Sequence, residues 1–154
     1  MTRIIAGFAG SRTLVVPKSG TRPTSDRVRE AIFSALEAAD AIAGARVLDL
    51  YAGSGALGLE AASRGAAIVQ LVERDPKAAA IAKRNAALVA DAAGRAERPR
   101  IGVAAAAVQT WLGTAGGGDA PAWDLVFIDP PYDLTEAALT EALAALPPLL
   151  TVDA

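Results

Sequence analysis

The sequence predicts an α/β fold with a mostly parallel sheet, and three observations support this class. An apolar run, 47–50, leads into a G-x-G-x-x-G turn and then into a helical segment, 57–64, which is how a strand, a tight turn and a helix N-terminus are encoded. Apolar runs then alternate with helical segments, as in parallel strands with right-handed crossovers. The run between Asp124 and Asp129 is apolar throughout, which predicts a strand buried on both faces.

Composition narrows the possible chemistry. The 154 residues are 53% hydrophobic and include neither cysteine nor histidine, so thiol nucleophiles, disulfides, zinc-finger ligation and imidazole bases are excluded. Carboxylates, backbone groups and an external cofactor remain to carry any reaction. No stretch resembles a signal peptide and no apolar run reaches membrane length. We therefore expect a cytoplasmic protein.

The N-terminal residues, 1–20, are predicted to form a basic β-hairpin extension ahead of a main domain, 21–154. Two β-prone runs, 3–8 and 12–16, flank a glycine-containing turn at 9–11. After Pro23, Thr24 or Ser25 can cap a helix. That capping is also the plain structural explanation for these two residues, and it does not exclude a place near a bound cofactor.

The helix after Pro23 has apolar residues at every fourth position. Val28, Ile32 and Leu36 predict its buried stripe. Arg27 and Arg29 fall off that stripe, so they are expected to face solvent or a partner.

Charge is distributed unevenly along the chain. Residues 1–30 hold six basic and two acidic side chains, whereas the remainder holds nine basic and fifteen acidic. This asymmetry suggests an arm that binds a polyanion, although a solvated surface would have the same composition. The candidate nucleic-acid-binding residues are Arg3, Arg12, Arg22, Arg27 and Arg29.

The main domain is predicted to continue in strict alternation. In chain order we expect a strand from Arg46, a helix ending at Gly65, a strand at 68–72, and a helix capped by Asp75-Pro76 that reaches about Gly94. A strand at 100–104 and a helix at 108–112 follow. After a mobile loop at 116–118, we expect a strand at 124–129 and a helix at 134–146. Residues 149–152 could begin a fifth strand. Without that strand the fourth one would lie at or next to a sheet edge, so C-terminal strands are expected beyond Ala154.

The glycine turn predicts a site for a nucleotide-like ligand without naming the ligand. Gly53 can take a backbone angle barred to other residues, Gly55 lets the main chain approach a ligand, and Gly58 lets the helix lie close on the sheet. Glu73 follows Gly53 by twenty residues, at the end of the next apolar run. A βαβ unit would aim this carboxylate at a ribose.

A second motif, Asp129-Pro130-Pro131-Tyr132, follows the fourth strand. The carboxyl ends of parallel strands share one edge, so this motif should face the same crevice as the glycine turn. The two prolines remove backbone donors and stiffen the loop, which leaves Asp129 and the main-chain carbonyls as acceptors. With the flat ring of Tyr132, these acceptors suit an exocyclic amino group on a planar base.

These motifs resemble those of S-adenosylmethionine-dependent amino methyltransferases with a Rossmann-like fold. Segments 21–30 and 49–61 are similar to the bacterial RsmD family, which methylates the N2 amino group of one guanine in 16S ribosomal RNA within the assembling small subunit. The resemblance implies S-adenosylmethionine as cofactor and 16S ribosomal RNA as partner. The protein is expected to be a monomer and to use no metal. The implied cofactor-binding residues are Asp49, Tyr51, Ala52, Gly53, Ser54, Gly55, Glu73, Arg74, Ala107, Val108 and Asp129.

The resemblance also implies individual roles. Asp49 would bind the cofactor's ammonium group, and Glu73 would accept hydrogen bonds from the ribose hydroxyls. Arg74 would lie beside the adenine. The catalytic residues would be Asp129, Pro130 and Tyr132, the last stacking on the target base. Family members usually carry Asp or Asn where this chain has Ala107-Val108, so backbone and apolar contacts would have to hold the adenine.

Other functions fit parts of the pattern. A glycine turn followed by a ribose carboxylate also suits NAD, but a dehydrogenase needs a proton donor and the chain has no histidine. A nucleotide-binding or RNA-binding module without catalysis stays open. So does an amino methyltransferase acting on adenine or on a protein glutamine, because related four-residue motifs serve all of these substrates.

Overall fold

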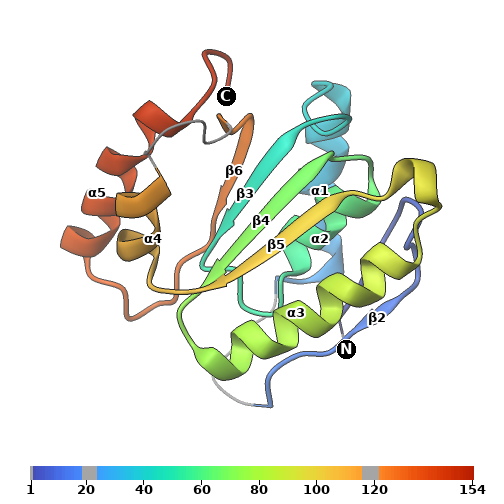
Figure 1. Ribbon diagram of the computed structural model, residues 1–154, viewed down its shortest axis with the longest axis horizontal. Coiled ribbons are helices and arrows are strands. Elements are labelled where there is room, and N and C mark those ends of the chain that lie inside the picture. Colours follow the sequence, from blue (N-terminus) through green and yellow to red (C-terminus); the bar gives the residue numbers. More distant parts are fainter. Residues whose placement is uncertain (1, 19–23, 116–121) are drawn as a thin grey trace.

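The computed structural model describes residues 2–18, 24–115 and 122–154, apart from the side chain of Glu97. Its centre is a four-stranded parallel sheet in the order β5-β4-β3-β6 (Figure 1). The strands are β3 (Arg46–Leu50), β4 (Ile68–Glu73), β5 (Arg100–Ala105) and β6 (Leu125–Ile128). The predicted α/β class and parallel sheet are confirmed. The predicted mobile loop at 116–118 and Arg22 lie outside the described residues.

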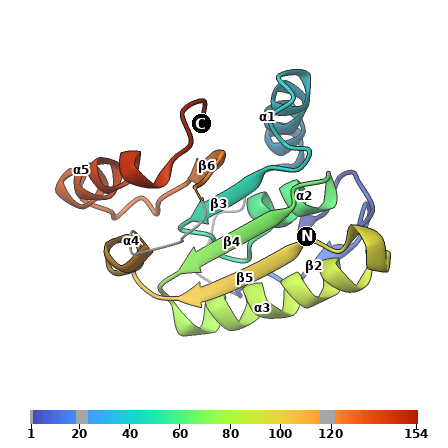
Figure 2. The ribbon, with the colours of Figure 1, turned by 45° about the horizontal axis from the view of Figure 1, so that its top comes forward.

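Helices cover both faces of the sheet (Figures 1 and 2). One layer contains α1 (Asp26–Ala38), α2 (Ala56–Ser63) and α3 (Pro76–Asp91), and the other contains α4 (Val108–Ala115) and α5 (Glu136–Ala145). Two short 3-10 turns, η1 (Arg95–Glu97) and η2 (Pro147–Leu149), complete the described elements. No helix in the described residues is both long and apolar enough to cross a membrane.

Successive residues of each strand point to opposite faces of the sheet, and each face carries an apolar cluster. Val47 and Val69 pack with the α1–α3 layer, whereas Leu48 and Leu50 pack with α4 and α5. This alternation is expected because side chains along a strand point to opposite faces with a period of two residues. Because both faces are covered, these strands read as continuous apolar runs.

The predicted N-terminal hairpin is confirmed, but its strands are short. β1 (Thr2–Arg3) pairs antiparallel with β2 (Thr13–Leu14). The backbone between them turns away from the ladder, since the amides of Ile5 and Ala6 donate to the Glu60 carboxylate on α2 at 2.8 and 3.1 Å. The hairpin is therefore held to α2 by side-chain acceptors.

The predicted buried stripe of α1 is wrong at Val28 and Ile32, whereas Leu36 is half-buried against the core. Val28 is 50% exposed and Ile32 is 36% exposed, while Arg29 and Phe33 are completely buried. The Phe33 ring lies 5.5 Å from the ring of Phe127 on β6, so this aromatic pair sets the helix face. The predicted cap is confirmed, because Ser25 accepts a hydrogen bond from the Val28 amide at 3.3 Å.

The prediction that both faces of the fourth strand are buried is confirmed in part, because Leu125 and Phe127 pack with the α1–α3 layer while Val126 and Ile128 pack with the α4–α5 layer. β6 is an edge strand of the described sheet, and Phe127 is its one buried residue. The predicted fifth strand is represented by one parallel bridge, Trp123 to Leu150. Trp123 precedes β6, so within the described residues β6 itself has no strand paired on its outer side.

Candidate functional site

The two sequence motifs lie side by side at one edge of the sheet. β3 pairs in parallel with both β4 and β6, and Leu50 is opposite Val72 on one side and Ile128 on the other. The glycine turn, the Glu73 carboxylate and Asp129 therefore start from three adjacent strand ends. This is the edge at which open α/β sheets bind ligands.

The glycine turn has the left-handed geometry that its sequence requires. Gly53 has φ 59° and Gly55 has φ 88°, and Gly55 caps the N-terminus of α2. A Cβ built on Gly53 would meet nothing within 4 Å, so this residue leaves the backbone open to a ligand. The preceding Tyr51 also has a positive φ, 58°, an unusual conformation that clusters at ligand sites.

The other two glycines make room for packing. A Cβ on Gly58 would lie 2.4 Å from Leu71 Cδ2, which confirms the predicted close approach of helix and sheet. A Cβ on Gly55 would lie 2.8 Å from Leu71 Cδ1. The prediction that Gly55 clears a path for the ligand is therefore wrong, because its missing side chain would point into the core.

Glu73 connects two loops of the site. Its Oε2 accepts a hydrogen bond from the Gly53 amide at 2.8 Å, and its Oε1 accepts one from the Asp75 amide at 3.0 Å. Glu73 therefore lies directly beside the glycine turn. Each oxygen keeps a further lone pair for a hydroxyl donor, and the ribose contact itself stays a prediction.

Asp49 lies beneath the glycine turn and is only 1% exposed. Its Oδ2 accepts a hydrogen bond from the Gly58 amide at 2.9 Å. Burial raises the pKa of Asp49 to about 7, with the nearby negative charges of Asp129 and Glu73 adding to the rise and the Gly58 amide opposing it. Three carboxyl groups thus gather at this edge, an arrangement that favours a cationic ligand.

The loop after β6 presents its side chains outward. Asp129 is exposed, and its Oδ2 accepts a hydrogen bond from the Thr24 hydroxyl at 3.3 Å. Tyr132 is 86% exposed. The Pro131 carbonyl accepts from the Leu134 amide at 3.1 Å. The Asp129 carboxylate is therefore outside the core and available to a substrate.

The predicted adenine wall is only partly accessible. Val108 is 2% exposed and packs in the cluster beneath α4, whereas Ala107 is half-buried and Arg74 is exposed. A role for these three residues in holding adenine stays a prediction.

Sequence reasoning missed Asn85 on α3. This side chain is 1% exposed, and its amide nitrogen donates to the carbonyls of Val15 at 2.8 Å and Ser54 at 2.9 Å. Its oxygen accepts from the Val15 amide at 2.9 Å. Asn85 therefore ties the chain after the hairpin to the glycine turn. A lone Asn within an alanine-rich helix was the available signal, because Asn is a poor helix former.

Arg29 does not belong to an exposed basic surface, and its predicted role in binding nucleic acid is wrong. The buried guanidinium lies 2.6 Å from Asp26, donates to the Arg3 carbonyl at 2.9 Å and lies 3.5 Å from Glu60. Arg29 therefore fixes α1 against the hairpin and α2. Arg3, Arg12 and Arg27 are exposed, as predicted.

The sheet order, the glycine turn and the carboxylates at the strand ends define the Rossmann-like fold of methyltransferases. A solved structure from Thermus thermophilus, titled as a hypothetical protein, matches with a TM-score of 0.79 and 35% identity over 98% of this chain and 81% of that one. An Escherichia coli structure, provisionally titled a methyltransferase, matches with a TM-score of 0.74 and 36% identity over 94% of this chain and 71% of that one.

The chain belongs to the family described as Conserved hypothetical protein 95, whose family model matches residues 2–153. It is 42% identical over 131 residues to the ribosomal RNA small subunit methyltransferase D of Escherichia coli K12, covering 84% of this chain and 60% of that protein. The enzyme of the same name from Haemophilus influenzae is 38% identical, with coverage of 90% and 68%. The resemblance to the RsmD family is confirmed. The chain spans about three fifths of the length of its first curated relative.

Proposed function

We propose that this chain carries the catalytic region of a methyltransferase that uses S-adenosylmethionine to methylate the N2 amino group of one guanine in 16S ribosomal RNA of the assembling small subunit, in the cytoplasm. The observation that carries this proposal is that Asp129-Pro130-Pro131-Tyr132 follows β6 where the glycine turn follows the adjacent strand β3. The names of the relatives support the substrate class.

The residues at the strand ends fit the cofactor. The open backbone at Gly53 would receive its methionine end, together with the main chain of Tyr51, Ala52, Ser54 and Gly55. The carboxylates of Asp49 and Glu73 would meet its ammonium group and ribose hydroxyls, since carboxylates accept charge-assisted hydrogen bonds well. When bound, the cofactor supplies a methyl group attached to a positively charged sulfur.

The loop after β6 would prepare the amino group for attack. A guanine amino nitrogen is a poor nucleophile because its lone pair is delocalised into the ring. Hydrogen bonds from that group to the Asp129 carboxylate and the Pro130 carbonyl would favour a tetrahedral nitrogen. Tyr132 would stack on the base, which must leave its helix or loop at a cost of a few kcal/mol, and positioning would supply most of the rate enhancement.

The test combines binding and transfer. Calorimetric titration should detect S-adenosylmethionine binding to the wild-type chain. Labelled methyl transfer into small-subunit particles from a strain lacking the enzyme should be abolished by Asp129→Ala, while cofactor affinity stays within a few fold of wild type. Label on adenine or on protein would make the substrate assignment wrong. Binding of RNA without any transfer would indicate a binding module.

A further inference from the structure

Thirteen of the fifteen basic residues of the chain lie in two stretches, 1–30 and 74–100. The second stretch contains three acidic residues and seven basic ones: Arg74, Lys77, Lys83, Arg84, Arg95, Arg98 and Arg100. By contrast, residues 101–154 contain seven acidic residues and no basic one. The basic residues are therefore concentrated in the first hundred residues, whereas 101–154, which supplies α4, α5, β6 and most of β5, carries only negative charge.

The two basic stretches meet in space although they are far apart in sequence. Asn85 on α3 exchanges two hydrogen bonds with the backbone of Val15, just after β2. Ile4 and Leu14 of the hairpin belong to the same apolar cluster as Ala82 of α3. Figures 1 and 2 both place β2 alongside α3. One side of the molecule thus carries both positive segments.

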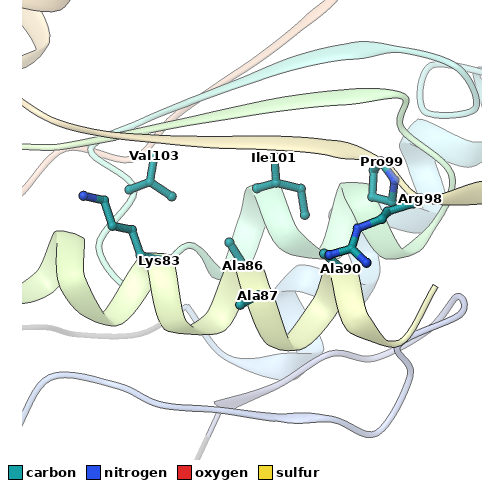
Figure 3. A pocket seen from close by; sticks show the side chains of 8 residues that line it. All are labelled: Lys83, Ala86, Ala87, Ala90, Arg98, Pro99, Ile101 and Val103. Atoms are coloured by element: carbon teal, nitrogen blue, oxygen red, sulfur yellow. The ribbon is translucent and has the colours of Figure 1, made fainter. Parts of the chain in front are cut away.

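A groove runs along this side between α3 and β5 (Figure 3). Its volume is about 340 Å³, and its lining consists of Lys83 and three alanines of α3 on one side and of Arg98, Pro99, Ile101 and Val103 on the other. The groove exists because short alanine side chains of α3 face the strand. Lys83 and Arg98 stand at its two ends, as Figure 3 shows.

The groove is oriented toward the candidate site. β5 is parallel to β4, with Val103 opposite Leu71 and Ala105 opposite Glu73. The Lys83 and Val103 end therefore lies nearer the edge that holds the glycine turn, and the Arg98 end lies farther from it.

The basic side chains around the groove are largely uncompensated. Within the part of the chain that the structure describes, Arg98 with Asp91 at 3.3 Å is the one ion pair formed by the stretch 74–100, and both partners are exposed. Exposed pairs of this kind contribute little to stability, so Arg98 can exchange its partner at low cost. Lys83 and Arg84 are exposed as well.

We propose that the α3–β5 groove binds the sugar-phosphate backbone of ribosomal RNA that leads away from the target nucleotide, with Lys83 and Arg98 contacting phosphates. This inference rests on the proposed function and extends its RNA contact from the hairpin across α3. The groove lining contains no aromatic side chain, so it suits a backbone track rather than stacked bases. Positive charge at both ends complements phosphates, whereas α5, with Glu136 and Glu141, would repel them.

The test uses the full chain and a 16S ribosomal RNA transcript, without cofactor. Lys83→Gln with Arg98→Gln should lower the slope of log affinity against log salt concentration by about 1.4 to 1.8, as expected for two lost phosphate contacts. The matched control is Ala137→Glu with Ala144→Glu, which makes the same change in net charge at exposed positions of α5. The control should keep the wild-type slope.

Equal slopes for the groove variant and wild type would overturn the groove proposal and leave the proposed methyl transfer intact. An equal reduction of the salt slope in the groove variant and in the control would also overturn the groove proposal, because the change in net charge alone would then explain the effect. A defect seen on ribonucleoprotein particles but not on the bare transcript would identify a protein partner and contradict the RNA assignment. Failure of the wild type to transfer methyl to RNA that it binds would instead refute the proposed function.

Discussion

The hydroxyl of Thr24 donates a hydrogen bond to Oδ2 of Asp129 at 3.3 Å, joining residues 105 positions apart in the sequence. Thr24 directly precedes the cap of α1, whereas Asp129 follows β6. Engagement of one carboxylate oxygen leaves the other free to accept from a substrate amino group. Thr24 is therefore a positioning residue for the proposed reaction.

Replacement of Thr24 tests this relationship. Thr24→Val should lower kcat for methyl transfer roughly tenfold, since a hydrogen bond to a charged group contributes about 1.5–3 kcal/mol and this one is exposed. Thr24→Ser keeps the hydroxyl and should retain most of the activity. Ser25→Ala removes the neighbouring cap and should lower stability by about 1 kcal/mol without the same loss of kcat. Similar kcat values for the Val and Ser variants would contradict the positioning role.

The buried carboxyl of Asp49 predicts a pH-dependent stability. Its pKa is about 7 in the folded chain against an ordinary value of 3.8, so the folded state binds the extra proton between these values and the free energy of unfolding falls as pH rises through that interval. Asp49→Asn cannot titrate and should lose this slope. Urea unfolding of both proteins between pH 4.5 and pH 7.5 measures it, and parallel pH profiles would contradict the assignment.

The same carboxyl predicts a proton exchange on cofactor binding. If the cofactor's ammonium group meets Asp49, the added positive charge lowers the pKa of that carboxyl, so binding near pH 7 should release protons. Calorimetric titration in buffers with different ionisation enthalpies measures the number released. Asp49→Asn should release fewer, and unchanged proton release in that variant would place the ammonium group elsewhere.

The close packing around Gly58 predicts that a larger residue at this position destabilises the fold. A Cβ there would lie 2.4 Å from Leu71 Cδ2 and 3.1 Å from Asp49 Cβ, so Gly58→Ala should destabilise the fold by about 1–3 kcal/mol. Gly94→Ala is the matched control, because a Cβ at Gly94 meets nothing within 4 Å and its φ is −66°. Chemical denaturation compares the two variants, and equal stabilities would contradict the close approach of α2 to the sheet.

The buried carboxylate of Glu60 predicts strong coupling with Arg29. Both side chains are fully buried, and Arg29 Nη1 lies 3.5 Å from Glu60 Oε1. Glu60→Leu should cost about 3–5 kcal/mol, because it removes the carboxylate that lies between Arg29 and Arg64 and accepts from the amides of the hairpin. Arg29 keeps Asp26 as a partner, and the hairpin should become susceptible to protease. Arg29→Met in the same chain should recover part of that loss. Additive effects in the double-mutant cycle would indicate that the two groups do not interact.

The sequence was most informative where local chemistry decides the structure. The glycine turn, the Ser25 and Asp75 caps and the alternating apolar runs all depend on neighbours within a few residues, and each is confirmed. The juxtaposition of the turn with Asp129 also followed, because parallel strands place their carboxyl ends at one edge.

The sequence failed where a partner from a distant segment decides the outcome. Arg29 looked like a surface cation because the groups that enclose it, the Arg3 carbonyl of the hairpin and Glu60 on α2, lie on segments distant in sequence. The buried face of α1 was misjudged for a related reason, since Phe33 finds its aromatic partner on β6. The partial exposure of Leu125, Val126 and Ile128 follows from the edge position of β6, and apolar content alone does not encode that exposure.

The double attachment of Asn85 gives the site a thermodynamic property. One amide side chain holds both the segment after the hairpin, at Val15, and the glycine turn, at Ser54. Ordering either segment reduces the entropy that remains to be lost when the other is ordered. Cofactor binding at the glycine turn and RNA binding at the hairpin should thus raise each other's affinity by the same factor. Asn85 would couple these two binding events.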